Sequence, residues 1–337
     1  MAQSEHLRPT RRRADFIIDT KTDFGGRFLT SNEINRPLVN PLIAKYAIAG
    51  DSFFIGSLDR GLDTRATVPQ LQEGITFLVD IDRSTALMNL VQLEIAAAHR
   101  DAYGDFTDTQ TYFDYFRPEN VEQALQLIHG AFSSEDQQII RRILSRTTNQ
   151  QQGLNLYDTL TLVKTHQDSW VSSAERINHM AQDYNDGKIL VANCDITNND
   201  HMRLLANYIQ HPLSIIDISN IDSHINFNPA KIEALRKVFG ARTTAVLPVA
   251  EHAYFVVTLN RITGPAIPNY IITIPYSNYY QRIENTFGYV LQSYQDWKHQ
   301  VAQSGLPGMK SDGDVLRERI TFGDLSVKME QNIYIAQ

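Results

Sequence analysis

Carboxylates follow the ends of short apolar segments in this chain, which is where an α/β protein places its ligand-binding groups. Asp80 ends the apolar run 75–79, Asp195 closely follows the run 188–193, and Asp59 lies in a loop after an earlier run. The carboxyl ends of parallel strands share one edge of a sheet, and ligands bind in the crevice beyond that edge. The sequence therefore predicts one polar crevice lined by these side chains.

The position of Asp80 suits it to accept hydrogen bonds from the ribose hydroxyls of a nucleotide. It lies 24 residues after Gly56, the glycine that stops the preceding apolar run. Acidic residues at about this spacing hold the ribose in dinucleotide-binding folds. An alternative is that Asp80 or Asp82 caps the next helix, a position that aspartate favours and for which Ser84 competes.

The loop after Gly56 lacks the pattern of a common phosphate-binding motif. Four residues separate Gly56 from Gly61, three of them bulky and two charged. This is not the Gly-x-Gly-x-x-Gly fingerprint, and no Lys-Ser/Thr pair follows Gly61 to complete a P-loop. Gly56 alone is also a common way to end a strand.

Two other groups of residues carry side chains that reactive or metal-binding sites use. Cys194 has the chemistry of a nucleophile, but no histidine is marked as its partner, and a cysteine at a strand end is usually inert packing. Metal-compatible atoms occur between Asp195 and His201, but their spacing matches no known metal-site pattern. No metal site is predicted.

The elements that position these residues alternate between strand and helix before residue 240. Such alternation predicts an α/β fold with a mostly parallel sheet, and consecutive late strands predict an antiparallel edge. The predicted strands are 52–55, 75–80, 188–193 and 213–218, then 243–249, 254–259 and 270–274. The predicted helices are 34–47, 67–73, 84–99, 107–116, 120–132, 134–146, 169–184, 200–210, 229–239 and 283–303, before a polar tail.

This pattern divides the chain into four parts. Residues 1–28 form an Arg-rich N-terminal arm laid over the domain, and residues 29–104 with 166–280 form the Rossmann-like domain. Residues 105–165 form a helical insertion, and residues 281–337 form a C-terminal helix and tail.

Composition restricts the partners and the location. The net charge is −7, which argues against broad nucleic-acid binding. No apolar stretch approaches the roughly 20 residues that a membrane span requires, and no secretory signal is visible. One cysteine among 337 residues excludes an intrachain disulfide. We expect a cytoplasmic protein, or one exported by a dedicated secretion system without a cleavable signal.

Five short patches, in order and at matching spacing, resemble a poorly characterised bacterial family with a Rossmann-like fold of the S-adenosylmethionine-dependent methyltransferase type. The patches are Ser31–Glu33, Phe54–Gly56, Phe77–Arg83, Val191–Asp195 and Ser219–Asp222. The resemblance implies a methyltransferase-type sheet and S-adenosylmethionine as cofactor.

The resemblance also implies roles for individual residues. Asp80 would hold the ribose, Gly56 would let the backbone approach the cofactor, and Asp195 would lie near its adenine or amino-acid end. The implied cofactor-binding residues are Gly56, Asp59, Asp80, Arg83, Asp195 and Ser219. The implied catalytic residues, which would orient the methyl acceptor, are Glu33, Asn220 and Asp222.

Departures from the family pattern keep two alternatives open. The family's loop Gly-x-Gly-Pro-Glu-Gln-Asn is replaced by Gly56–Leu62, its glycine before Asp195 is Cys194, and one of its arginines is Asp82. The first alternative is a catalytically inactive fold that binds a protein partner, with the insertion 105–165 as a partner surface or a lid. The second is a different enzyme on the same scaffold.

Overall fold

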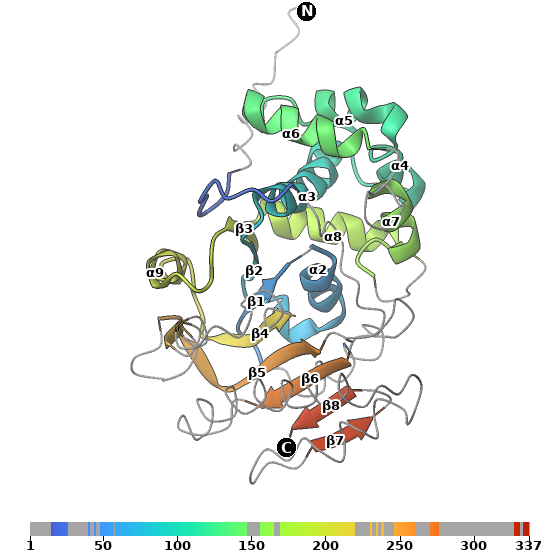
Figure 1. Ribbon diagram of the computed structural model, residues 1–337. Helices are drawn as coiled ribbons and strands as arrows, with labels where there is room; N and C mark the ends of the chain where they lie inside the picture. Colours follow the sequence, from blue (N-terminus) through green and yellow to red (C-terminus); the bar gives the residue numbers. More distant parts are fainter. Residues whose placement is uncertain are drawn as a thin grey trace, which may run out of the picture.

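A computed structural model describes most of the chain up to residue 219 and separate segments after it (Figure 1). The described residues are 15–25, 40, 44, 48–56, 58–146, 156–164, 169–219, 230, 234, 237–238, 246–259, 270–275, 327–330 and 333–336.

Five parallel strands form the larger part of the sheet. They are β1 (Asp51–Ile55), β2 (Thr76–Asp80), β3 (Ile189–Asn193), β4 (Leu213–Ser219) and β5 (Val249–Leu259), and they lie in the order β3-β2-β1-β4-β5. The first three are short and almost entirely buried, as expected for strands covered on both faces. The predicted α/β fold with a mostly parallel sheet is confirmed.

An antiparallel edge follows the parallel strands, as predicted. β6 (Tyr270–Pro275) runs antiparallel to β5, β8 (Ile333–Ala336) pairs parallel with β6, and β7 (Val327–Glu330) closes the sheet antiparallel to β8. The prediction of a polar tail is wrong for these last residues, because two strands of four residues were too short for the sequence pattern to reveal.

The prediction of two separate strands at 243–249 and 254–259 is also wrong. β5 is one strand, but its pairing with β4 jumps from Leu213–Val249 to Ile215–Tyr254. The extra residues of β5 therefore bulge out of the ladder, and a bulge of this kind interrupts the alternation of side chains that marks a strand in sequence.

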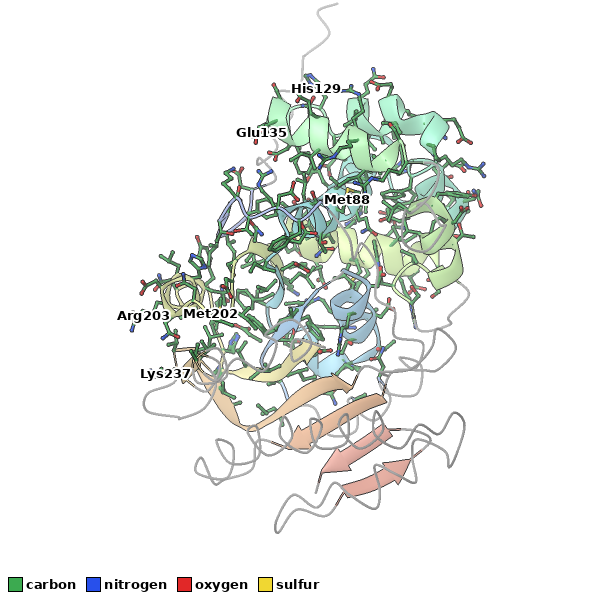
Figure 2. All side chains as sticks on the ribbon, in the orientation of Figure 1. Met88, His129, Glu135, Met202, Arg203 and Lys237 are labelled. Carbon is green, nitrogen blue, oxygen red and sulfur yellow. The ribbon has the colours of Figure 1, made fainter. Side chains whose placement is uncertain are left out.

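Three helices cover one side of the parallel strands, and α9 (Asn199–Ala206) lies on the other side (Figure 1). The three are α2 (Leu58–Thr67), α3 (Arg83–Tyr103) and α8 (Ala174–Asn185). On α9, Met202 is buried and Arg203 points outward (Figure 2).

Helix α2 was not predicted. The sequence pattern predicts a loop at 56–61 and a short helix at 67–73, of which only the 3-10 turn η1 (Pro69–Leu71) forms. The sequence pattern does not reveal α2 because the buried face of this helix carries charged and polar side chains in place of an apolar stripe. Arg65, for example, is fully buried and donates to Asp183 on α8 and to four acceptors between residues 71 and 76.

The described residues of the predicted insertion form helices joined by short turns. It contains α4 (Thr109–Asp114), the 3-10 turn η2 (Pro118–Asn120), α5 (Val121–Leu127), α6 (Ser134–Leu144) and α7 (Leu156–Lys164). The insertion packs on α3 on the side away from the sheet (Figure 1).

Because α3 has neighbours on all sides, its residues 83–99 are all buried. Met88, near the middle of the molecule, has no exposed surface (Figure 2). Sheet residues such as Phe54 and insertion residues such as Ile140 belong to one continuous hydrophobic core. The insertion and the sheet layer therefore share a core, with α3 between them.

The described part of the N-terminal arm, residues 15–25, runs beside β3. Ile17 N donates to Val191 O at 3.0 Å, Asn193 N donates to Ile18 O at 2.8 Å, and Thr20 N donates to Asn193 O at 3.1 Å. Asp19 and Asn193 form a parallel bridge. The arm thus extends the sheet beyond β3 and then reaches the N-terminus of α3.

Three predicted helices lie largely or wholly outside the described residues. Of 34–47, the described Asn40 and Ala44 are helical; of 229–239, so are the described positions 230, 234, 237 and 238; none of 283–303 is described.

Candidate functional site

The order of the parallel strands reverses between β1 and β4, and Gly56 is the first residue after β1 at this switch point. Its N–H donates to Val79 O at 2.9 Å, and its carbonyl accepts from Asn89 Nδ2 of α3 at 3.2 Å. Its φ of +106° favours glycine, and a Cβ placed there would meet no atom within 4 Å. Gly56 therefore offers an open approach to the backbone where α/β proteins bind ligands.

Asp80 ends β2 at the same edge of the sheet and keeps part of its surface exposed. Its Oδ1 accepts from Asp82 N at 2.7 Å, and its carbonyl accepts from Cys194 N at 3.0 Å. Burial, with a smaller contribution from the charge of Asp82, raises the pKa of Asp80 to about 7. The carboxyl is thus poised to change charge near neutral pH.

Asp82 caps the N-terminus of α3, which is one of the alternatives that the sequence left open, and Ser84 does not. Asp82 Oδ1 accepts from Ser84 N at 3.2 Å at the start of α3, and Oδ2 accepts from Thr85 Oγ1 at 3.0 Å. Oδ1 also accepts from Phe24 N of the arm at 2.9 Å. Burial raises the pKa of Asp82. These contacts give Asp82 a structural role.

Arg83 lies beside Asp82 but is used within the protein. Its guanidinium pairs with Asp19 of the arm at 3.2 Å and with Asp136 of α6 at 2.7 Å, and the side chain is almost fully buried. Arg83 therefore ties the arm and the insertion to α3. The structure gives it two protein partners where the sequence suggested a cofactor.

Asp59 faces the interior. It is 1% exposed in the first turn of α2. The pKa of Tyr112 on α4 is raised mainly by the burial of Tyr112 and, to a smaller extent, by the charge of Asp59. The next residue, Arg60, pairs with Asp217 of β4, and both side chains are buried. The start of α2 thus directs two charged side chains into the interior.

Asp195 follows β3 and is partly exposed. Its Oδ1 accepts from Thr197 N at 2.8 Å and from Thr197 Oγ1 at 2.7 Å, which fixes the turn. The pKa of the buried Cys194 thiol is raised by burial and then by the charges of Asp195 and Asp80. Both carboxylates therefore lie near Cys194, which places Asp80 and Asp195 at one end of the sheet.

Of the four remaining predicted site residues, only Ser219 lies among the residues that the structure describes. Ser219 is the last residue of β4, paired with Val257 of β5. Glu33, Asn220 and Asp222, the predicted catalytic residues, lie outside the described residues.

Sequence reasoning missed two contributors to this end of the sheet. Asn193, the last residue of β3, donates to the carbonyls of Asp80 and Ile81 at 3.1 and 2.8 Å and accepts from Thr20 Oγ1 at 3.1 Å. The arm supplies Thr20 and Phe24. A polar residue at the end of a buried strand and the short apolar run Phe16-Ile17-Ile18 were the signals in the sequence.

The arrangement has the chemistry of a site for a hydroxyl-bearing ligand. One partly exposed aspartate, Asp80, ends the strand beside an open glycine backbone. Within the described residues, no group of three or more His, Cys, Asp or Glu side chains could hold a metal ion. Among the helices that the structure describes, none combines the length and apolarity needed to span a bilayer.

Comparison with known proteins adds a family but no activity. No curated protein matches the chain. A family model described as a domain of unknown function (DUF7790) matches residues 28–323, a range that includes the sheet end described above and most of the chain. The chain therefore belongs to the DUF7790 family.

Proposed function

We propose that this protein is an S-adenosylmethionine-dependent methyltransferase that acts on an unknown acceptor. The observation that carries the proposal is the pairing of Asp80 with Gly56 at the carboxyl ends of β1 and β2. A partly exposed aspartate ends one strand, and a Cβ at the glycine that follows its neighbour would meet open space. The strand order β3-β2-β1-β4-β5 with an antiparallel neighbour supports a Rossmann-like sheet of the methyltransferase type.

The residues fit a nucleoside. The ionised Asp80 carboxylate would accept hydrogen bonds from the two ribose hydroxyls, and Gly56 would allow the ligand to lie against the backbone. Ile81, which is 38% exposed and adjacent to Asp80, offers an apolar contact for a base. Asp195 would bind near the adenine or amino-acid end. S-adenosylmethionine would supply an activated methyl group, and the protein would mainly align donor and acceptor.

A titration with S-adenosylmethionine and S-adenosylhomocysteine tests the proposal. We expect micromolar binding by calorimetry at pH 8 and at least a tenfold loss in Asp80→Ala. Asp105→Ala is a matched control, because Asp105 is an exposed carboxylate paired with Arg100 on another part of the molecule. The absence of heat and of a thermal shift at millimolar ligand would contradict the proposal.

A catalytically inactive fold that binds a protein partner is the second candidate. The observation that favours it is the buried pair between Arg60 and Asp217, which fills space between α2 and β4 next to the switch point. If this pair leaves no room for the amino-acid end of the cofactor, Arg60→Ala should create binding that the native protein lacks. Binding by the native protein that Arg60→Ala leaves unchanged would remove this argument.

A further inference from the structure

The N-terminal arm is anchored to the sheet end by polar contacts on two sides. On the β3 side, its backbone pairs with Val191 and Asn193. On the α3 side, Arg83 N donates to Thr22 O at 2.7 Å and Ser84 Oγ donates to Asp23 Oδ1 at 2.6 Å. The arm therefore has a defined position around the ends of β2 and β3.

The anchored arm carries a solvent-exposed aromatic ring. Phe24 is 56% exposed, although its backbone N–H is fixed by Asp82. Ile81, also exposed, directly follows Asp80. Two of the five large apolar side chains that are exposed among the described residues thus belong to the segments immediately around one carboxyl. Hydrogen bonds through Asp82 link them, because Asp82 Oδ1 accepts from Phe24 N and Asp82 N donates to Asp80 Oδ1.

We infer that the arm forms one wall of the ligand site and that the Phe24 ring covers the base of a nucleoside whose ribose is held by Asp80. This inference rests on the proposed function and extends it, since it names the ligand class as one with a planar base. It also links binding to the arm, because a ligand that contacts Phe24 stabilises the docked arm. Stacking on an aromatic ring tolerates any base, so adenosine alone is a sufficient probe.

The test compares Phe24→Ala with Tyr103→Ala. Tyr103 is a matched control because it is an aromatic residue with 72% exposure at the far end of α3, about 30 Å away along a 21-residue helix. We expect Phe24→Ala to weaken S-adenosylhomocysteine and adenosine by about five- to twentyfold, and Tyr103→Ala by less than twofold. Phe24→Trp should retain binding.

Proteolysis gives a second readout. Lys21 lies in the arm with an exposed side chain, so trypsin cleavage after it reports on docking. Ligand should slow this cleavage in the native protein and in Tyr103→Ala, but not in Phe24→Ala. Equal affinities for native protein and Phe24→Ala would overturn the inference and leave the proposed function intact. Failure of the native protein to bind either ligand would overturn both.

Discussion

The raised pKa of Asp80 predicts that the ionised Asp80 carboxylate lowers the free energy of unfolding of the protein. In the folded state the carboxyl keeps its proton up to about pH 7, whereas its ordinary pKa is 3.8. The unfolded chain therefore releases this proton at lower pH, and the stability contributed by Asp80 falls as the pH rises from about 4 to 7. Above pH 7 both states are ionised and the full cost is present.

The magnitude follows from the size of the shift. The difference between a pKa of about 7 and the ordinary 3.8 corresponds to a ceiling of about 4 kcal/mol, and the partial exposure of Asp80 reduces this to about 2 kcal/mol. Asp80→Asn keeps an acceptor for Asp82 N and carries no charge. We therefore expect Asp80→Asn to be more stable than the native protein by about 2 kcal/mol at pH 8.5, or roughly 3 °C in Tm for a chain of 337 residues.

Thermal unfolding of both proteins at pH 5 and pH 8.5 is the assay. The gain from Asp80→Asn should be small at pH 5, larger at pH 7 and constant above it. Asp105→Asn, at an exposed carboxylate, should show no such trend. If Asp80→Asn gains the same amount at both pH values, or is less stable at pH 8.5, the argument from burial is wrong. A gain in stability with a loss of ligand binding would mark Asp80 as kept for function.

Four other outcomes are expected. The affinity for S-adenosylhomocysteine should fall about tenfold between pH 8 and pH 6 as Asp80 protonates, and calorimetry would reveal a flat profile if this is wrong. The buried Cys194, whose pKa is raised by burial, should not react with a thiol reagent at pH 8 until the protein is denatured. Arg83→Ala should lower the free energy of unfolding by about 3 kcal/mol in denaturant and speed trypsin cleavage after Lys21. Arg65→Met should cost about 3–5 kcal/mol in the same assay, because it leaves Asp183 as a buried charge without this partner.

The sequence predicted the parallel strands well because their apolar runs are short, buried on both faces and bounded by clear helix signals. It failed at α2, where Arg65 and its neighbours bury charge that only tertiary contacts can satisfy. It also failed in β5, where a bulge breaks the alternation, and at β7 and β8, where the strands are very short. These are cases in which distant partners decide local structure.

The candidate site was predicted in part for the same reason. Strand ends can be located from sequence, so Gly56, Asp80 and Asp195 could be assigned to one edge of the sheet. Whether a charged side chain there faces solvent or the interior depends on what packs above it. Arg83 and Asp59 are held inside by the arm, the insertion and α2, and no local pattern encodes those contacts.

The pairing of residues 17–20 with β3 also has a consequence for association between chains. The outer edge of a sheet is a template on which another polypeptide can add a strand. Here residues 17–20 of the arm occupy that template through Val191 and Asn193. A chain shortened to begin after residue 25 would expose these peptide groups, and we expect it to self-associate or aggregate more readily than the full chain.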